Sequence, residues 1–158
     1  MACYIAAMRI FEHMAELAAL SGQDIATSDW VEITQQQIDL FAQATGDHQW
    51  IHVDPERAAE GPFGTTIAHG FLTLSLLPRF FDSALHVRDT RMGVNYGLNR
   101  VRFTAPVPVG SRLRAQLKLI ACEPIAGNGH QLTWQVTVER EGSDKPVCIA
   151  ESITRRYV

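Results

Sequence analysis

The sequence predicts an α+β fold in which helices come first and an antiparallel β-sheet follows. Helical periodicity and helix caps are confined to the part before Arg91, whereas β-rich segments separated by turn residues fill the part after it. One of the predicted helices is apolar nearly all round, which suggests that the sheet wraps around it. Helices gathered on one face of an antiparallel sheet can enclose a single hydrophobic core.

Local patterns predict the elements of the first half. Residues 10–20 have the spacing of a short amphipathic helix, and residues 28–33 alternate enough to form a first strand. Thr34-Gln35-Gln36-Gln37 is a capping-box pattern, which predicts a helix that ends at Gly46. Residues 55–59 then predict one or two helical turns.

The apolar helix begins at Gly70 and extends to residue 81. Its composition is that of a helix buried on every side. Pro78 lies inside it and lacks a backbone donor, so we expect it to end or kink the helix.

The second half of the chain predicts a meander of strands. These strands cover residues 93–103, 112–122, 130–141 and 147–157. Leu132, Trp134, Val136 and Val138 alternate with polar residues, so they should point together toward the core.

Bulk composition predicts one globular domain over residues 1–158, with 46% hydrophobic and 20% charged residues. The net charge of −3 gives no reason to expect nucleic acid or a membrane as partner, and no apolar run is long enough to span a bilayer. The scattered cysteines predict no zinc site and favour a cytoplasmic location. The N-terminus lacks signal-peptide features, and residues 1–10 are expected to be a poorly ordered extension.

Asp47 and His52 are the most informative pair of side chains. They stand five positions apart, directly after the helix that Gly46 is predicted to end. Taken singly, Asp47 could be a turn residue and His52 polar surface. In one loop, they offer an imidazole that titrates near neutral pH and a carboxylate that can hand on a proton. This pair is therefore the candidate catalytic group for adding water to a polarised double bond.

Gly70 is a candidate for binding negative charge. Amides in the first turn of a helix have no partner inside the helix, and the helix dipole favours an anion there. The Gly70 amide could thus stabilise an oxyanion, although the glycine could equally serve close packing. The neighbouring His69 is interpreted as a structural residue that bonds to backbone. Asn95 and Asn99 lie on a predicted strand and could line a pocket.

These residues resemble the signature of the MaoC-like dehydratase family, which includes (R)-specific enoyl-CoA hydratases and a nodulation protein N-like branch. The signature is an aromatic residue, small residues, Gly-Asp-x-Asn-Pro-aliphatic-His and a later small residue. Here these positions hold Phe41, Ala42, Ala44, Gly46, Asp47, Ile51, His52 and Ala58. Gln49 stands where asparagine is usual and Trp50 where proline is usual. The segments 67–70, 96–103 and 106–107 also match.

The resemblance covers residues 11–157 and implies a hotdog fold, in which an antiparallel sheet wraps a central helix, and a homodimer. It assigns Asp47 and His52 as the catalytic pair and directs the thioester carbonyl to the Gly70 amide. It implies hydration of trans-2-enoyl-CoA to (R)-3-hydroxyacyl-CoA, with coenzyme A or acyl carrier protein as carrier and no metal or redox cofactor. Candidates for the substrate pocket are Gln49, Trp50, His69, Phe71, Asn95 and Asn99.

Two other functions stay open on the sequence. A hotdog acyl-CoA thioesterase would use a carboxylate to direct water at the carbonyl carbon, and the spaced pair of Asp47 and His52 argues against it. A non-catalytic acyl-CoA-binding protein would bind the thioester without turnover, and the intact pair argues against this function too.

Overall fold

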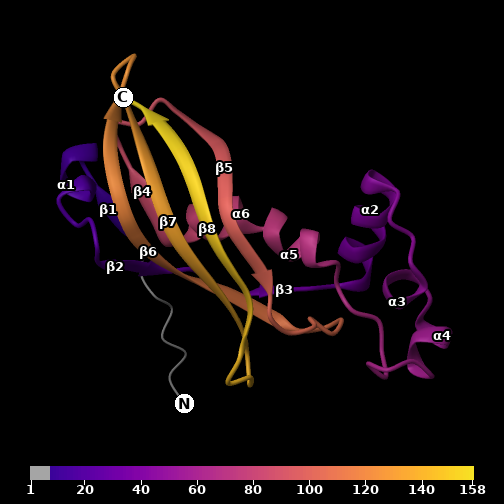
Figure 1. Cartoon of the computed structure of the whole chain (residues 1–158). Coiled ribbons are helices and arrows are strands. Elements are labelled where there is room, and N and C mark those ends of the chain that lie inside the picture. The colour runs from indigo at the N-terminus through magenta and orange to yellow at the C-terminus, as the bar shows by residue number, and fades with distance from the viewer. Residues whose placement is uncertain (1–7) are drawn as a thin grey trace.

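Residues 8–158, the part that the computed structural model describes, form a curved antiparallel sheet with helices along its inner face (Figure 1). The elements in chain order are β1 (Arg9–Phe11), α1 (Met14–Ala18), β2 (Asp24–Thr27), β3 (Val31–Glu32), α2 (Gln35–Thr45), α3 (Trp50–Val53), α4 (Pro55–Ala59), α5 (Gly70–Ser75), α6 (Leu77–Ala84), β4 (Leu85–Val87), β5 (Met92–Phe103), β6 (Arg112–Ile125), β7 (Gly129–Arg140) and β8 (Pro146–Tyr157).

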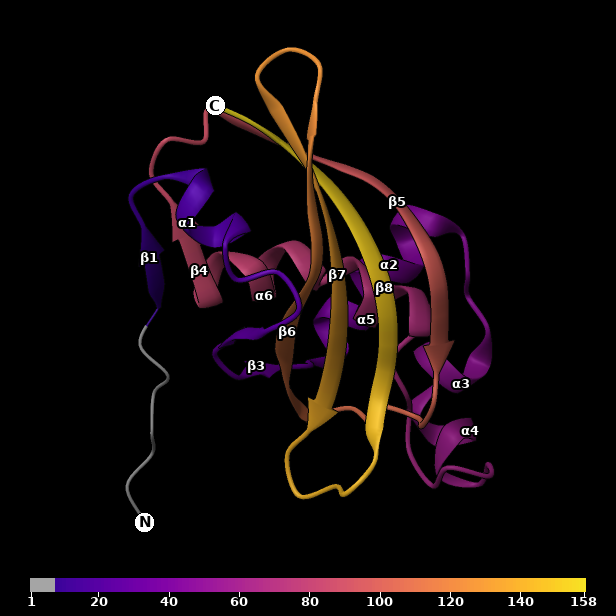
Figure 2. The same cartoon turned by 60° about the vertical axis from the view of Figure 1, so that its left-hand side comes forward.

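The main sheet has the strand order β2-β6-β7-β8-β5, with β3 also paired to β6, and all of these pairs are antiparallel. The long strands curve around α5 and α6, as the turned view also shows (Figure 2). This is the α+β hotdog arrangement, so the predicted fold class is confirmed. The four predicted strands of the second half are also confirmed, with boundaries that differ by a few residues at most.

The core lies between α6 and the inner face of the sheet. Leu132, Trp134, Val136 and Val138 are all fully buried, as their alternation predicts. The Trp134 ring meets Phe81 of α6 edge to face, with centroids 5.1 Å apart. Burying each large apolar side chain contributes about 1.5–3 kcal/mol, so this contact fixes α6 against the strands.

Helix α2 begins and ends where the sequence predicts. Thr34 Oγ1 accepts the Gln37 amide at 3.2 Å, and Gln37 Oε1 accepts the Thr34 amide at 3.0 Å. Gly46 ends the helix in the left-handed conformation, with φ of 79°. Because such a backbone is strained for residues with a side chain, Gly46 allows the chain to turn directly into Asp47.

The apolar helical segment is broken, as Pro78 predicts. Helix α5 ends at Ser75, and α6 begins at Leu77 with Pro78 in its first turn, where a missing amide costs little. The prediction of a helix buried on every side is wrong along one face. Phe71 is 67% exposed there, and Ser75, Pro78 and Arg79 are exposed as well. The Phe71 ring meets Phe103 edge to face, with centroids 5.7 Å apart.

Two early elements differ from the sequence prediction. Residues 10–20 form β1 and α1 in place of one helix, because Arg9–Phe11 pairs in parallel with Leu85–Val87, a contact invisible to local periodicity. The strand expected over residues 28–33 is wrong except at Val31–Glu32, which form β3, and β2 precedes it over Asp24–Thr27. Between β2 and β3, buried Ser28 Oγ accepts the Ala115 amide at 2.8 Å.

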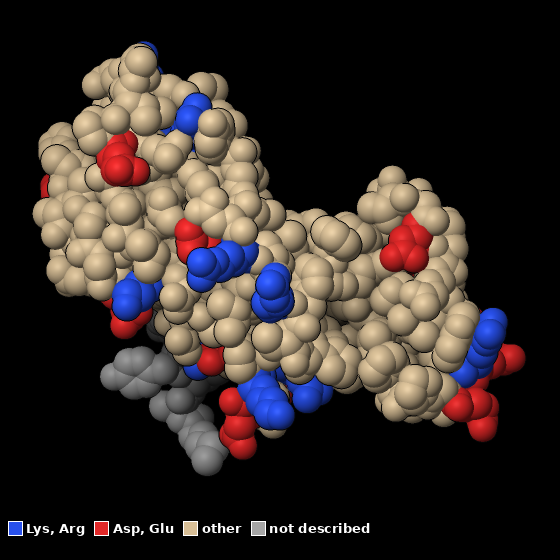
Figure 3. Space-filling view, viewed as in Figure 1, with Lys and Arg blue, Asp and Glu red and all other residues tan. Residues whose placement is uncertain are grey.

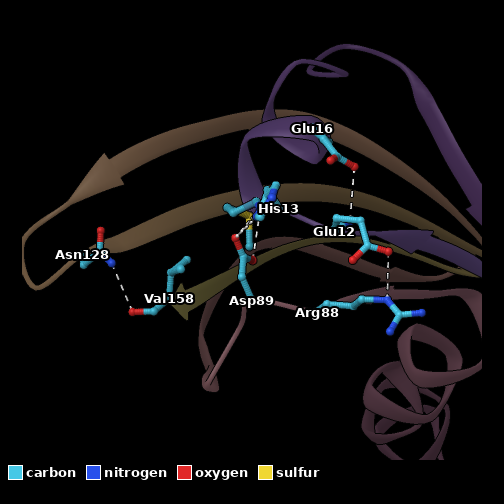
Figure 4. A network of polar contacts seen from close by, with 8 residues as sticks. Glu12, His13, Glu16, Arg88, Asp89, Asn128 and Val158 are labelled. Carbon is cyan, nitrogen blue, oxygen red and sulfur yellow. Dashed lines mark hydrogen bonds and ion pairs between the residues drawn. The ribbon is translucent and has the colours of Figure 1, made fainter.

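Polar contacts hold the segment after β1 in place (Figure 4). Asp89 accepts the Met14 amide at 3.1 Å and lies 3.3 Å from His13 Nδ1, while Arg88 pairs with Glu12 at 3.0 Å. Of the expected poorly ordered extension, residues 1–7 lie outside the described residues. Arg9 and Ile10 do not fit that expectation, since both belong to β1.

The face drawn in Figure 3 carries no large patch of one charge. On the face drawn in Figure 3, Lys and Arg are intermingled with Asp and Glu, and a hollow separates the sheet from the segment containing α2, α3 and α4. Within residues 8–158, no helix is both long and apolar enough to cross a membrane.

Candidate active site

The structure brings Asp47 and His52 together with His69, which lies seventeen residues after His52 in the chain. One ligand-type atom from each of the three side chains lies within 4.8 Å of the others. Asp47 lies in the loop after α2, His52 on α3, and His69 at the start of α5. The Asp47 side chain is exposed, whereas both imidazoles are buried. Asp47 and His52 thus form, together with His69, one polar cluster at the edge of the protein interior.

His52 is held in an orientation suited to a general base. Its Nδ1 lies 2.7 Å from the Ile67 carbonyl oxygen, which can only accept, so Nδ1 carries the proton and donates. Nε2 is left with a lone pair. Burial lowers the pKa of His52 from the ordinary 6.5, and the nearby His69 lowers it further, while the Ile67 hydrogen bond and Asp47 act in the opposite direction.

His69 supports the other two residues. Its ring stacks on His52, with centroids 3.8 Å apart and planes inclined by 25°. Its Nε2 lies 3.0 Å from the backbone carbonyl of Asp47, to which it donates. His69 therefore links the Asp47 loop to α5 and limits rotation of the His52 ring. This contact fits the structural role predicted for His69, which bonds to backbone.

A cavity of about 370 Å³ opens beside His52. His52, Gly70 and Thr73 lie in its wall, together with Phe63, Phe103 and other mainly apolar residues. Such a volume with a few convergent polar groups is typical of a small-molecule site. The sequence predicts His52 and Gly70 in this site but not Thr73. A signal exists, because Thr73 follows Gly70 by three positions and so shares its helix face.

The position of Gly70 is consistent with both roles that the sequence leaves open, an oxyanion donor and a residue needed for close packing. It begins α5 and lies in the cavity wall, as an oxyanion donor would. However, a Cβ atom at this position would lie 2.6 Å from Cδ2 of Phe103, which is too close for any side chain without movement of the ring. Close packing alone therefore already requires glycine here.

Several residues proposed for the pocket are not among those that line this cavity. Trp50 packs against Arg57, whose guanidinium carbon is 4.5 Å from the ring centroid. Asn99 donates to Glu151, and Phe71 is exposed. Asn95 lines a second cavity of about 450 Å³ between β5 and the junction of α5 and α6. Gln49 lies beside the pair, where its backbone N–H donates to the Asp47 carboxylate at 3.4 Å.

The imidazoles and carboxylate also have donor types that can bind a divalent cation. The sequence predicts no metal at this site, and that expectation stays a prediction.

The geometry defines a hotdog protein with a His and Asp pair whose histidine lies in the wall of an apolar cavity, and comparison with known proteins identifies its family. The family described as "MaoC like domain" matches residues 16–141, so the chain belongs to the MaoC-like dehydratase family. A 3-hydroxyacyl-thioester dehydratase Z from Mycobacterium tuberculosis is 60% identical over 148 residues, 94% of this chain and 98% of that protein. Nodulation protein N from Rhizobium leguminosarum is 49% identical over 143 residues, 89% of each.

A solved structure shares the fold. The R-hydratase from Pseudomonas aeruginosa superposes with a TM-score of 0.66 at 26% identity, over 87% of this chain and 81% of that one. The names of these relatives, dehydratase and hydratase, are those of hydro-lyases.

Proposed function

We propose that this protein reversibly hydrates a trans-2-enoyl thioester to the (R)-3-hydroxyacyl thioester. The observation that carries the proposal is the fixed orientation of His52 in the cavity wall, where the Ile67 carbonyl holds Nδ1 and leaves Nε2 unprotonated, with Asp47 close by. The names of two relatives, 3-hydroxyacyl-thioester dehydratase and R-hydratase, support the substrate class and the configuration.

In the proposed reaction, Asp47 and His52 hold one water molecule. Its oxygen forms a bond to C3 while His52 Nε2 takes a proton, and the double-bond electrons move toward the thioester. The resulting enolate places negative charge on the thioester oxygen, where the Gly70 amide donates to it. The proton then passes to C2 with the help of Asp47, which completes addition of water and restores both side chains.

The acyl group of the proposed substrate needs a carrier that forms a thioester. We propose coenzyme A or acyl carrier protein, because both present the acyl chain as a thioester whose carbonyl can reach α5. The described cysteines Cys122 and Cys148 are free, which supports a reducing, cytoplasmic setting.

Crotonyl-CoA tests the function. We expect loss of the enoyl absorbance without release of free thiol, and no change after treatment with a chelator, because the proposed steps use only side chains and amides. Free thiol released at the rate of enoyl loss would indicate a thioesterase instead. Tight binding of crotonyl-CoA without any reaction would indicate a binding protein.

The acid side of the pH profile reports on His52. The base acts only when neutral, and its lowered pKa keeps it neutral at more acidic pH than an ordinary histidine. We therefore expect kcat/KM to fall on the acid side with an apparent pKa below 6.5. Hydration rates measured across mildly acidic buffers give this value. An apparent pKa above 6.5 would contradict the assignment of buried His52 as the base.

We also propose a homodimer that forms through β5. This strand is at one edge of the main sheet, so one side of it is unpaired within the described residues. Its large side chains are exposed, including Val94 (42%), Tyr96 (54%) and Leu98 (46%). A long apolar edge strand promotes pairing with another chain, and pairing with a second copy in two-fold symmetry removes the exposed edge.

Charge placed on β5 should weaken the dimer. We expect the native protein to sediment as a dimer at micromolar concentration and Leu98→Lys to shift it toward monomer, because a buried unpaired charge is costly. Ile149→Lys is the matched control, since Ile149 is 38% exposed but lies on the interior strand β8. A native protein that sediments as a monomer, or equal effects of the two changes, would exclude β5 as the interface.

A further inference from the structure

Thr73 is a buried polar residue of the cavity that the proposed mechanism leaves unused. Its side chain is 1% exposed, and it lies in the cavity wall with His52 and Gly70. Among the described residues, its Oγ1 atom has no hydrogen-bond partner. A buried hydroxyl without a partner is costly, so one that belongs to the wall of a binding cavity is a candidate contact for a ligand.

The nearby Ser75 shows what a helical hydroxyl ordinarily does. Ser75 Oγ donates to the Phe71 carbonyl, four residues back, at 2.7 Å. Thr73 Oγ1 makes no such bond to the corresponding carbonyl of His69, although the Thr73 amide does donate to it at 3.2 Å. The Thr73 hydroxyl therefore has no hydrogen-bond partner among the described residues, although Thr73 belongs to the cavity wall.

Helix geometry places the Thr73 side chain close to the turn that begins at Gly70. Side chains of an α-helix lean toward the N-terminus and lie over the preceding turn. Thr73 is three positions after Gly70 on α5, so its side chain lies over the turn that begins with the Gly70 amide. A ligand oxygen near that amide would thus lie close to the Thr73 side chain.

We infer that Thr73 is a substrate-binding residue whose hydroxyl donates a second hydrogen bond to the thioester carbonyl oxygen. The inference rests on the proposed function. A carbonyl oxygen has two lone pairs and accepts from two donors, here an amide and a hydroxyl. As the oxygen gains charge in the enolate, both bonds strengthen, so Thr73 contributes more to the rate than to ground-state binding.

Three variants test this inference. Thr73→Val keeps the shape of the side chain and removes the hydroxyl, and Thr73→Ser keeps the hydroxyl. Thr90→Val is the matched control, because Thr90 Oγ1 is also buried without a partner among the described residues but Thr90 is not among the residues that line this cavity. We expect Thr73→Val to lower kcat for crotonyl-CoA by roughly 10²-fold with little change in KM. Thr73→Ser and Thr90→Val should keep most of the activity.

Stability separates this role from a packing role. Because the valine replaces an unpartnered hydroxyl by a group of the same shape, the melting temperature of Thr73→Val should be unchanged or higher. A variant that is stable and yet slow supports the inference. Normal kcat per folded molecule in Thr73→Val, or a loss in Thr73→Ser as large as in Thr73→Val, would overturn it.

A measurement that needs no turnover separates the role of Thr73 from the proposed hydratase function. The carbonyl stretching frequency of bound butyryl-CoA, a saturated thioester that cannot be hydrated, should be lowered by the native protein and less so by Thr73→Val. Inactivity of the native protein toward crotonyl-CoA would reject the proposed function, whatever this frequency shows. Equal carbonyl frequencies in the native protein and Thr73→Val would reject the role of Thr73, even in an active hydratase.

Discussion

Asp47→Asn and His52→Ala should each lower the hydration rate of crotonyl-CoA by at least about 10²-fold, because a positioned acid or base contributes about 10²–10⁴. His52→Ala removes the base whose Nδ1 is fixed by the Ile67 carbonyl. Asp47→Asn keeps the size of the side chain but loses its negative charge and its ability to take up a proton. Initial rates per folded molecule, with folding checked by circular dichroism, give the effect.

The double variant and a neighbouring histidine sharpen this test. Since Asp47 and His52 act on the same water, the double variant should be little slower than the slower single variant. His48→Ala is the control, because His48 lies between them in sequence with an exposed side chain. Near-normal turnover in either folded single variant would remove that residue from the mechanism.

Gly70→Val should have the second large effect, about 10²-fold on the rate per folded molecule, the typical result of losing one oxyanion donor. The side chain would keep the thioester oxygen away from the backbone amide. It would also collide with Phe103, since a Cβ atom at position 70 would lie 2.6 Å from that ring. Stability should therefore fall as well, and rate and melting temperature must be measured together.

Removal of the Phe103 ring separates the two effects. Phe103→Ala makes room for a side chain at position 70, so the double variant Gly70→Val with Phe103→Ala should recover stability. Its rate should stay low when compared with Phe103→Ala alone, because the amide remains blocked. Recovery of the full rate of Phe103→Ala would show that Gly70 serves packing alone.

Local sequence rules predict those parts of the fold that local interactions determine. The capping box at Thr34, the left-handed Gly46 and the break near Pro78 each depend on a few neighbouring residues, and all three are confirmed. Alternation in the long strands also reports burial directly, as the fully buried Trp134 shows. Asp47 and His52 lie close together because both belong to the short segment between the helix that ends at Gly46 and the helical turns that begin at Pro55.

The remaining features depend on contacts between distant parts of the chain. Strand β1 exists because Arg9–Phe11 meets β4, more than seventy residues later. The exposure of Phe71 depends on where the sheet ends, and no periodicity reports this. Thr73 could be recognised only once its hydroxyl was seen to be buried beside the cavity without a partner. Helical spacing alone does not distinguish such a residue from an ordinary core threonine.

The central claim is that Asp47 and His52 add water across an enoyl thioester from one face. The most direct measurement identifies the product that the native protein forms from crotonyl-CoA. It must distinguish the hydrated thioester from the hydrolysed acid, and the (R) from the (S) enantiomer. We expect (R)-3-hydroxybutyryl-CoA as the product, at a rate that falls by at least about 10²-fold in His52→Ala. Crotonate with free coenzyme A, the (S) product, or unreacted crotonyl-CoA in the presence of folded native protein would contradict it.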